Sequence, residues 1–156
     1  MYKLTQSRPG ADEGRLSLFY AGNREHTGLD NVTFFDKDHV AFVEDASDTV
    51  HSQRSAFDSA YLFDVTRNYS RGGDPVRFLA EGRDPSATVD GLLGAAGNGF
   101  QNEGDNEITG IHVSDGDPGP GGILGAKVPR LFHDGWRLFW TQQHGDSTTW
   151  EVVPAP

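Results

Sequence analysis

Short runs of β-branched and aromatic residues, separated by turn residues, constrain the fold of this 156-residue chain more than any other feature. No segment has a sustained 3.6-residue period in its apolar positions, so the sequence predicts no amphipathic helix. Twenty Gly and eight Pro are available for the turns between the runs. The sequence therefore predicts an all-β protein, and its length suits a single domain.

The predicted strands fall into three groups along the chain. Residues 2–20 form a predicted hairpin, whose second strand alternates Leu16, Leu18 and Tyr20 on one face. Residues 31–80 contain four runs joined as an up-and-down meander, at 31–35, 39–44, 60–65 and 76–80. Residues 107–153 supply three more runs, at 107–113, 136–142 and 149–153. The predicted strand count is therefore two, then four, then three.

Both faces of the predicted strands carry apolar residues, as Val40 and Phe42 against Ala41 and Val43 show. This pattern favours sheets stacked between neighbouring sheets. Four-stranded antiparallel units that recur every 40 to 60 residues or so are typical of β-propeller blades. A closed ring needs at least about 16 strands, so we expect two to three blades of a larger propeller. A β-sandwich with a similar number of strands is the alternative.

The charge balance excludes some classes of partner. Thirteen Lys and Arg against 23 Asp and Glu give a formal net charge of −10. Such a chain is unsuited to nucleic acid and to anionic membranes, and it favours cations. The absence of Cys excludes disulfides and thiolate ligands. No apolar run approaches the ~20 residues of a membrane span, and the first residues lack the pattern of a signal peptide.

Acidic and amide side chains gather at the predicted ends of strands. Residues 84–126 contain no Lys or Arg, seven carboxylates and eleven Gly, and residues 84–106 form a predicted acidic loop. Glu107 follows this loop, Asp30 and Asn31 open the first strand of the meander, and Glu44 ends the second. Calcium binds six to eight such oxygens. Taken singly, each cluster is equally typical of a turn.

The six His residues show no zinc-protease spacing, and the chain has no Gly-x-Ser-x-Gly motif. His39 and His112 lie in predicted strands and are interpreted as packing residues. His144 lies in the predicted loop between two strands and is the better candidate for a site. Asp115 cannot open an EF-hand loop, because Pro120 stands where that loop needs Gly and Ala126 where it needs Glu.

Four blocks, taken in order, resemble the C-terminal part of the PhoX-type alkaline phosphatase family. They are Leu29-Asp30-Asn31-Val32, the run from Val40 to Glu44-Asp45, Asn106-Glu107-Ile108-Thr109-Gly110, and the strand ending in Gln142-Gln143-His144-Gly145. The resemblance implies a multi-bladed propeller, secreted or periplasmic in bacteria. It also implies hydrolysis of phosphate esters with calcium and iron in the central channel.

Carried over by position, the resemblance implies metal ligands at Glu44 and Glu107, with Asp30 and Asn31 beside them. His144 then matches a substrate-binding position. We expect the carboxylates of Glu44 and Glu107 to project toward a common cavity.

The iron-binding cysteine and N-terminal blades of the family have no counterpart in this chain. We therefore expect weak or no phosphatase activity from the chain alone, together with self-association or a missing propeller chain. The alternative function is a non-catalytic, calcium-stabilised propeller fragment that acts as a binding module. A β-sandwich without metal is a third possibility.

Overall fold

The computed structural model describes residues 1–8, 10–23, 26, 28–46, 58–80, 108–119, 127–142 and 148–155. This described part is all-β, as the sequence predicts. Its elements are β1 (Tyr2–Thr5), β2 (Arg15–Leu18), β3 (Leu29–Phe34), β4 (His39–Glu44), β5 (Ser59–Asp64), the 3-10 turn η1 (Tyr69–Arg71), β6 (Val76–Ala80), β7 (Ile108–Ser114), β8 (Arg137–Gln142) and β9 (Thr149–Val152). The predicted acidic loop at residues 84–106 lies outside the described residues.

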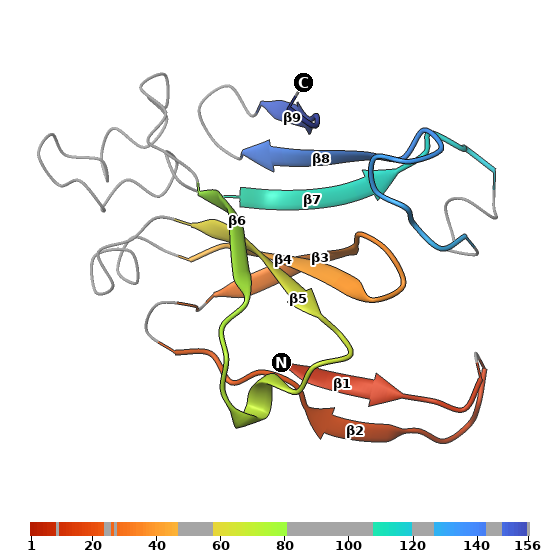
Figure 1. Ribbon diagram of the computed structural model, residues 1–156, viewed down its shortest axis with the longest axis vertical. Coiled ribbons are helices and arrows are strands. Elements are labelled where there is room, and N and C mark those ends of the chain that lie inside the picture. The colour runs from red at the N-terminus through yellow and green to blue at the C-terminus, as the bar shows by residue number, and fades with distance from the viewer. Residues whose placement is uncertain are drawn as a thin grey trace, which may run out of the picture.

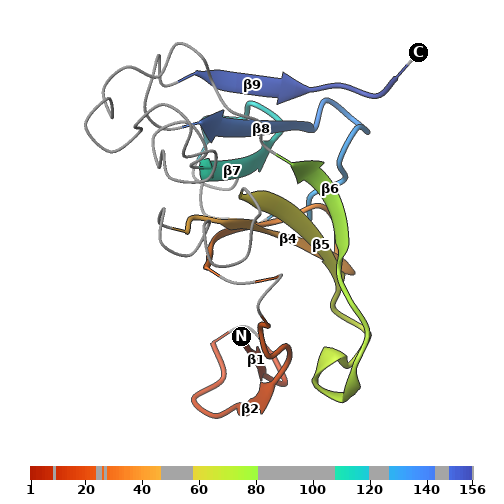
Figure 2. The ribbon, with the colours of Figure 1, turned by 90° about the vertical axis from the view of Figure 1, so that its left-hand side faces the viewer.

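The strands form three antiparallel sheets with two, four and three strands, as predicted. Within each sheet the spatial order follows the sequence: β1-β2, β3-β4-β5-β6 and β7-β8-β9. Figures 1 and 2 show these sheets following one another along the long axis of the molecule. The prediction that the meander at residues 31–80 forms one sheet is confirmed.

A tight turn at Asp36 joins β3 to β4. The Oδ1 atom of Asp36 accepts hydrogen bonds from the backbone N–H groups of Asp38 (2.7 Å) and His39 (2.8 Å). An Asp side chain that bonds the backbone two residues later is typical of such turns. The turn therefore closes the hairpin and presents Asp36 and His39 at one end of the sheet.

Each face of the four-stranded sheet packs in a hydrophobic cluster, because successive apolar residues of β4 point to opposite faces. Ala41 and Val43 pack in a cluster with Ile108 and Leu138 of the three-stranded sheet. Val40 belongs to a second cluster, which contains the aromatic residues Phe19, Tyr20, Tyr61, Phe63 and Tyr69. Two-sided burial explains why the sequence of β4 is apolar on both faces.

The three-stranded sheet packs against the four-stranded sheet with β3 and β7 in contact. Near the last residues of both strands, the Thr33 Oγ1 atom accepts a hydrogen bond from the Val113 N–H group at 3.2 Å. Close by, the Leu131 N–H group donates to the Phe35 carbonyl oxygen at 3.0 Å. These bonds align the ends of the two sheets.

The register then defines two opposite ends. Leu29 of β3 pairs with Glu44 of β4, and Ile108 of β7 pairs with Gln142 of β8. We call this the site end, because Asp30, Asn31 and Glu44 lie there. The other end carries the turn at Asp36 and is called the turn end.

Candidate functional site

Two carboxylates are completely buried at the site end, where β4 ends and β5 begins. Glu44 and Asp58 have no exposed surface. The Glu44 Oε2 atom accepts a hydrogen bond from the Ser59 N–H group at 3.1 Å. The Ala46 N–H group lies 3.2 Å from both carboxylate oxygens of Asp58. Glu44 therefore also has a structural role, because it caps the backbone at the end of the hairpin.

A β-bulge shapes the start of β3, since the register with β4 shifts between Leu29 and Val32. Asp30 in this bulge is exposed, and Asn31 is half-buried. Within the described part of the chain, no hydrogen-bond partner reaches the buried Oδ1 atom of Asn31. A buried amide oxygen without a donor is uncommon in folded proteins, and it is a suitable ligand for calcium.

Asn31 and Glu44 lie on opposite faces of the four-stranded sheet. Glu44 follows Val40 and Phe42 on one face, whereas Thr33, two residues after Asn31, faces β7. A cation bound by both side chains would therefore lie beyond the ends of the strands. The structure brings these residues to one end but not onto one surface.

Glu107 and His144 lie outside the described residues, so the predicted common cavity of Glu44 and Glu107 stays a prediction. In the sequence, Glu107 directly precedes Ile108 and His144 follows Gln142 by two positions. Both Ile108 and Gln142 are buried at the site end. Among the described residues, no group of three or more His, Cys, Asp or Glu side chains could hold a metal ion.

Lys127 partly neutralises the acidic turn after β7. The Lys127 Nζ atom lies 2.7 Å from an Asp115 carboxylate oxygen and 2.6 Å from an Asp117 carboxylate oxygen. The hydrogen bonds from Lys127 hold the pKa of both carboxyl groups below the ordinary value, and they raise the pKa of Lys127. The ammonium group of Lys127 is therefore the cation that binds both of these carboxylates.

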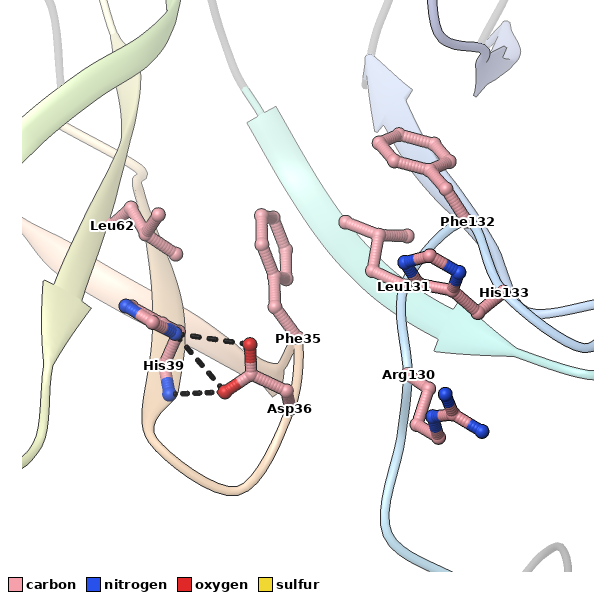
Figure 3. A pocket seen from close by; sticks show the side chains of 8 residues that line it. All are labelled: Phe35, Asp36, His39, Leu62, Arg130, Leu131, Phe132 and His133. Carbon is pink, nitrogen blue, oxygen red and sulfur yellow. Dashed lines mark hydrogen bonds and ion pairs between the residues drawn. The ribbon is translucent and has the colours of Figure 1, made fainter.

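A pocket of about 470 Å³ opens at the turn end, between the β3–β4 turn and the segment before β8. Figure 3 shows its two walls. The residues that line it are Phe35, Asp36, His39, Leu62, Arg130, Leu131, Phe132 and His133. Four of the eight are apolar and the other four can carry charge, so the pocket offers both apolar surface and polar groups to a ligand.

One wall carries an Asp–His pair. The His39 Nδ1 atom lies 3.0 Å from each carboxylate oxygen of Asp36. Partial burial opposes the ionisation of Asp36, but the hydrogen bonds from Asp38 and His39 outweigh it and hold the pKa of Asp36 below its ordinary value. Because an ionised carboxylate only accepts hydrogen bonds, the Nδ1 atom carries the proton.

The interpretation of His39 and His112 as packing residues is wrong. The His39 side chain is 41% exposed and bonds Asp36 at the end of the hairpin. His112 is exposed because its neighbours Ile111 and Val113 take the buried face of β7. The signal that sequence reasoning missed is the spacing of Asp36 and His39, three residues apart across a tight turn.

The other wall is a double turn at residues 130–136. The His133 N–H group donates to the Arg130 carbonyl at 2.8 Å, and the Trp136 N–H group donates to the His133 carbonyl at 3.0 Å. Phe132 (φ 66°) and Asp134 (φ 53°) adopt the left-handed region that non-glycine residues seldom occupy. Arg130 forms an ion pair with Asp134 across this turn.

Comparison with known proteins gives no match to a protein family, to a curated protein or to a solved structure. Among the residues that the structure describes, no helix has the length and apolar character to cross a membrane.

Proposed function

We propose that this chain is the C-terminal portion of a PhoX-like, metal-dependent phosphatase, and that its site end supplies oxygen ligands beside a bound phosphate ester. The observation that supports the proposal is the common end of the strands that carry the four resembling blocks. β3 and β7 begin at the site end, and β4 and β8 end there. The described residues of these blocks, which are spread over more than 100 residues of sequence, thus reach one edge of two neighbouring sheets.

The arrangement of the sheets also fits a propeller. Each sheet is antiparallel with its strands in sequence order, and the two larger sheets pack against each other through one apolar cluster. Blades of a propeller have this internal order and this kind of contact with their neighbours. In such an assembly the site end would lie on one face of the ring, where the channel opens.

The donor set fits a hard divalent cation. The buried Oδ1 of Asn31 lacks a hydrogen-bond donor in the described part of the chain, and Asp30 in the same bulge is exposed. The resemblance would add the carboxylates of Glu44 and Glu107, and Glu44 could share a cation with Asn31 only beyond the ends of the strands. Calcium accepts such mixtures of amide and carboxylate oxygens. A bound cation would neutralise phosphate oxygens and lower the pKa of a coordinated water.

The alternative function is a non-catalytic, calcium-stabilised binding module. The fully buried Glu44 carboxylate accepts a hydrogen bond from the Ser59 N–H group, which is a structural contact and favours a stabilising role for this end of the sheet. In both functions Asn31 contributes to calcium binding, so calcium is tested first and turnover separately.

The first prediction concerns calcium and thermal stability. We expect calcium to raise the melting temperature of the chain, and Asn31→Ala to reduce that rise because it removes an oxygen ligand. A ligand at 100 times its Kd stabilises the folded state by about 2.7 kcal/mol, which is ample for detection. Differential scanning calorimetry with and without calcium measures both values.

Asn68→Ala is the matched control. Asn68 caps the 3-10 turn η1, where its Oδ1 atom accepts a hydrogen bond from the Ser70 N–H group at 3.1 Å. This variant is expected to lose some stability but to keep the full calcium response. No calcium response in the unmodified chain, or an undiminished one in Asn31→Ala, contradicts the proposed ligand.

A further inference from the structure

We propose that the pocket at the turn end binds a small organic anion with an apolar body, held by Arg130 and His133. This site is independent of the proposed cation site, because it lies at the opposite end of the sheets. Its volume of about 470 Å³ lies within the range of ordinary small-molecule sites.

The apolar part of the pocket comes from both walls. Phe35 and Leu62 belong to the four-stranded sheet, and Leu131 and Phe132 to the double turn. In Figure 3 the side chains of Phe35 and Leu131 lie on facing sides of the pocket. An aromatic or branched aliphatic group between them would be removed from water on two sides, which favours binding.

Arg130 and His133 provide donors for an anionic group. Both residues line the pocket from the same turn. The Arg130 side chain is 63% exposed and its guanidinium contacts Asp134, but the five N–H donors of that group exceed what one carboxylate uses. Arginine binds carboxylates and phosphates in a forked geometry, so a ligand anion can share it with Asp134 or replace Asp134.

Asp36 does not reverse this preference for an anion. Its carboxylate accepts hydrogen bonds from the N–H groups of Asp38 and His39 and lies against the His39 ring. These donors occupy the carboxylate oxygens and stabilise the negative charge on that wall. Arg130 and His133 come from the opposite wall, so the donors for a ligand and the carboxylate are separated.

The backbone holds the pocket in place before any ligand binds. The Leu131 N–H group donates to the Phe35 carbonyl at 3.0 Å, which joins the two walls directly. Two hydrogen-bonded turns and two left-handed non-glycine residues, Phe132 and Asp134, fix the segment that carries His133. Strained backbone conformations persist only where the surrounding structure stabilises them, and they cluster at ligand sites. A preformed pocket binds its ligand with less loss of entropy.

The test measures the binding of benzoate and of phenyl phosphate by isothermal titration calorimetry, with benzamide as the neutral analogue. We expect at least one of the two anions to bind, and benzamide to bind about tenfold more weakly or not at all, since a charged hydrogen bond is lost. Equal binding of benzamide and both anions, or no binding of either anion, overturns the proposal.

Three variants assign the site. Arg130→Gln is expected to weaken anion binding about tenfold. Asp134→Asn is expected to strengthen it, because the competing carboxylate is removed while Asn tolerates the same left-handed backbone. Arg137→Gln is the control: Arg137 lies 3.7 Å from Glu151 in an exposed ion pair and does not line this pocket. Unchanged binding in both Arg130→Gln and Asp134→Asn rejects the assignment.

Discussion

Among the described residues, Phe132 has a left-handed backbone that is poorly suited to a bulky side chain, and this strain can be tested. Its φ of 66° is easy for Gly and costs an L-residue about 1–2 kcal/mol. Phe132→Gly and Phe132→Ala both remove the ring, so their difference reports the backbone alone. We expect the Gly variant to be more stable than the Ala variant by about 1 kcal/mol in urea denaturation.

The same pair of substitutions at Phe34 is the control. Phe34 is a half-exposed residue in β3, where the backbone is extended. There the Gly variant is expected to be less stable than the Ala variant, by about 0.5–1 kcal/mol. The same sign at both positions would show that the conformation of Phe132 carries no strain.

At the residue scale, the sequence carries only those signals that are local. The pair Asp134-Gly135 is a strong turn signal, and both residues have positive φ in the turn between His133 and Trp136. The left-handed Phe132 has no such signal, because only tertiary contacts such as Leu131 with Phe35 compensate for its cost. The orphan amide oxygen of Asn31 is likewise invisible without the neighbouring strands.

At the element scale, one side-chain hydrogen bond joins the two larger sheets. The Thr33 Oγ1 atom accepts from the N–H group of the buried Val113 at 3.2 Å. Thr33→Val keeps the shape of the side chain but leaves that N–H group without this acceptor. We expect a loss of about 1–3 kcal/mol of unfolding free energy, measured by urea denaturation.

Thr66→Val is the comparison for this prediction. The Thr66 hydroxyl donates to the Asp64 carboxylate at 2.6 Å in an exposed turn, where water can replace it. Its loss is expected to cost less than 1 kcal/mol or so. An equal loss of unfolding free energy in the two variants would mean that the hydrogen bond between β3 and β7 stabilises the fold no more than an exposed one.

The strands themselves were predictable because alternation and turn chemistry are local signals. Their ends were not. The predicted second strand of the hairpin includes Tyr20, whereas β2 ends at Leu18 and the next two residues leave the strand to enter the aromatic core. Both Phe19 and Tyr20 donate from the backbone to the Met1 carbonyl. A tertiary core therefore decides where the strand stops.

At the scale of the whole molecule, the sequence could predict which residues are site candidates but not which surface they share. Asp30, Asn31 and Glu44 do reach one end of one sheet. The alternation of side chains separates Asn31 from Glu44, and that separation depends on the bulge in β3. Whether ligands from several sheets meet depends on how the sheets pack, and the sequence of a single strand does not determine that.

An apolar surface at the hairpin supports the expectation that the chain associates with itself. Tyr2 pairs with Leu18 and Leu4 with Leu16, so all four side chains share one face of the two-stranded sheet, and all four are exposed. An apolar sheet face of this kind favours association in water.

The last prediction concerns the oligomeric state and the phosphatase activity of the chain. We expect light scattering to show species larger than a monomer, and a chromogenic phosphomonoester to be hydrolysed poorly even with calcium and iron. Two or three blades would leave a channel site open to water and short of ligands, so the preorganised stabilisation of the transition state is lost. The double variant Leu4→Lys with Leu16→Glu places opposite charges on paired strand positions, which supports the pairing of the hairpin and replaces two of the four apolar residues of that face. This variant should be monomeric.

Rapid metal-dependent turnover by the monomer would mean that the chain is a complete, smaller enzyme, because no second copy or further blade would then be needed to build the site.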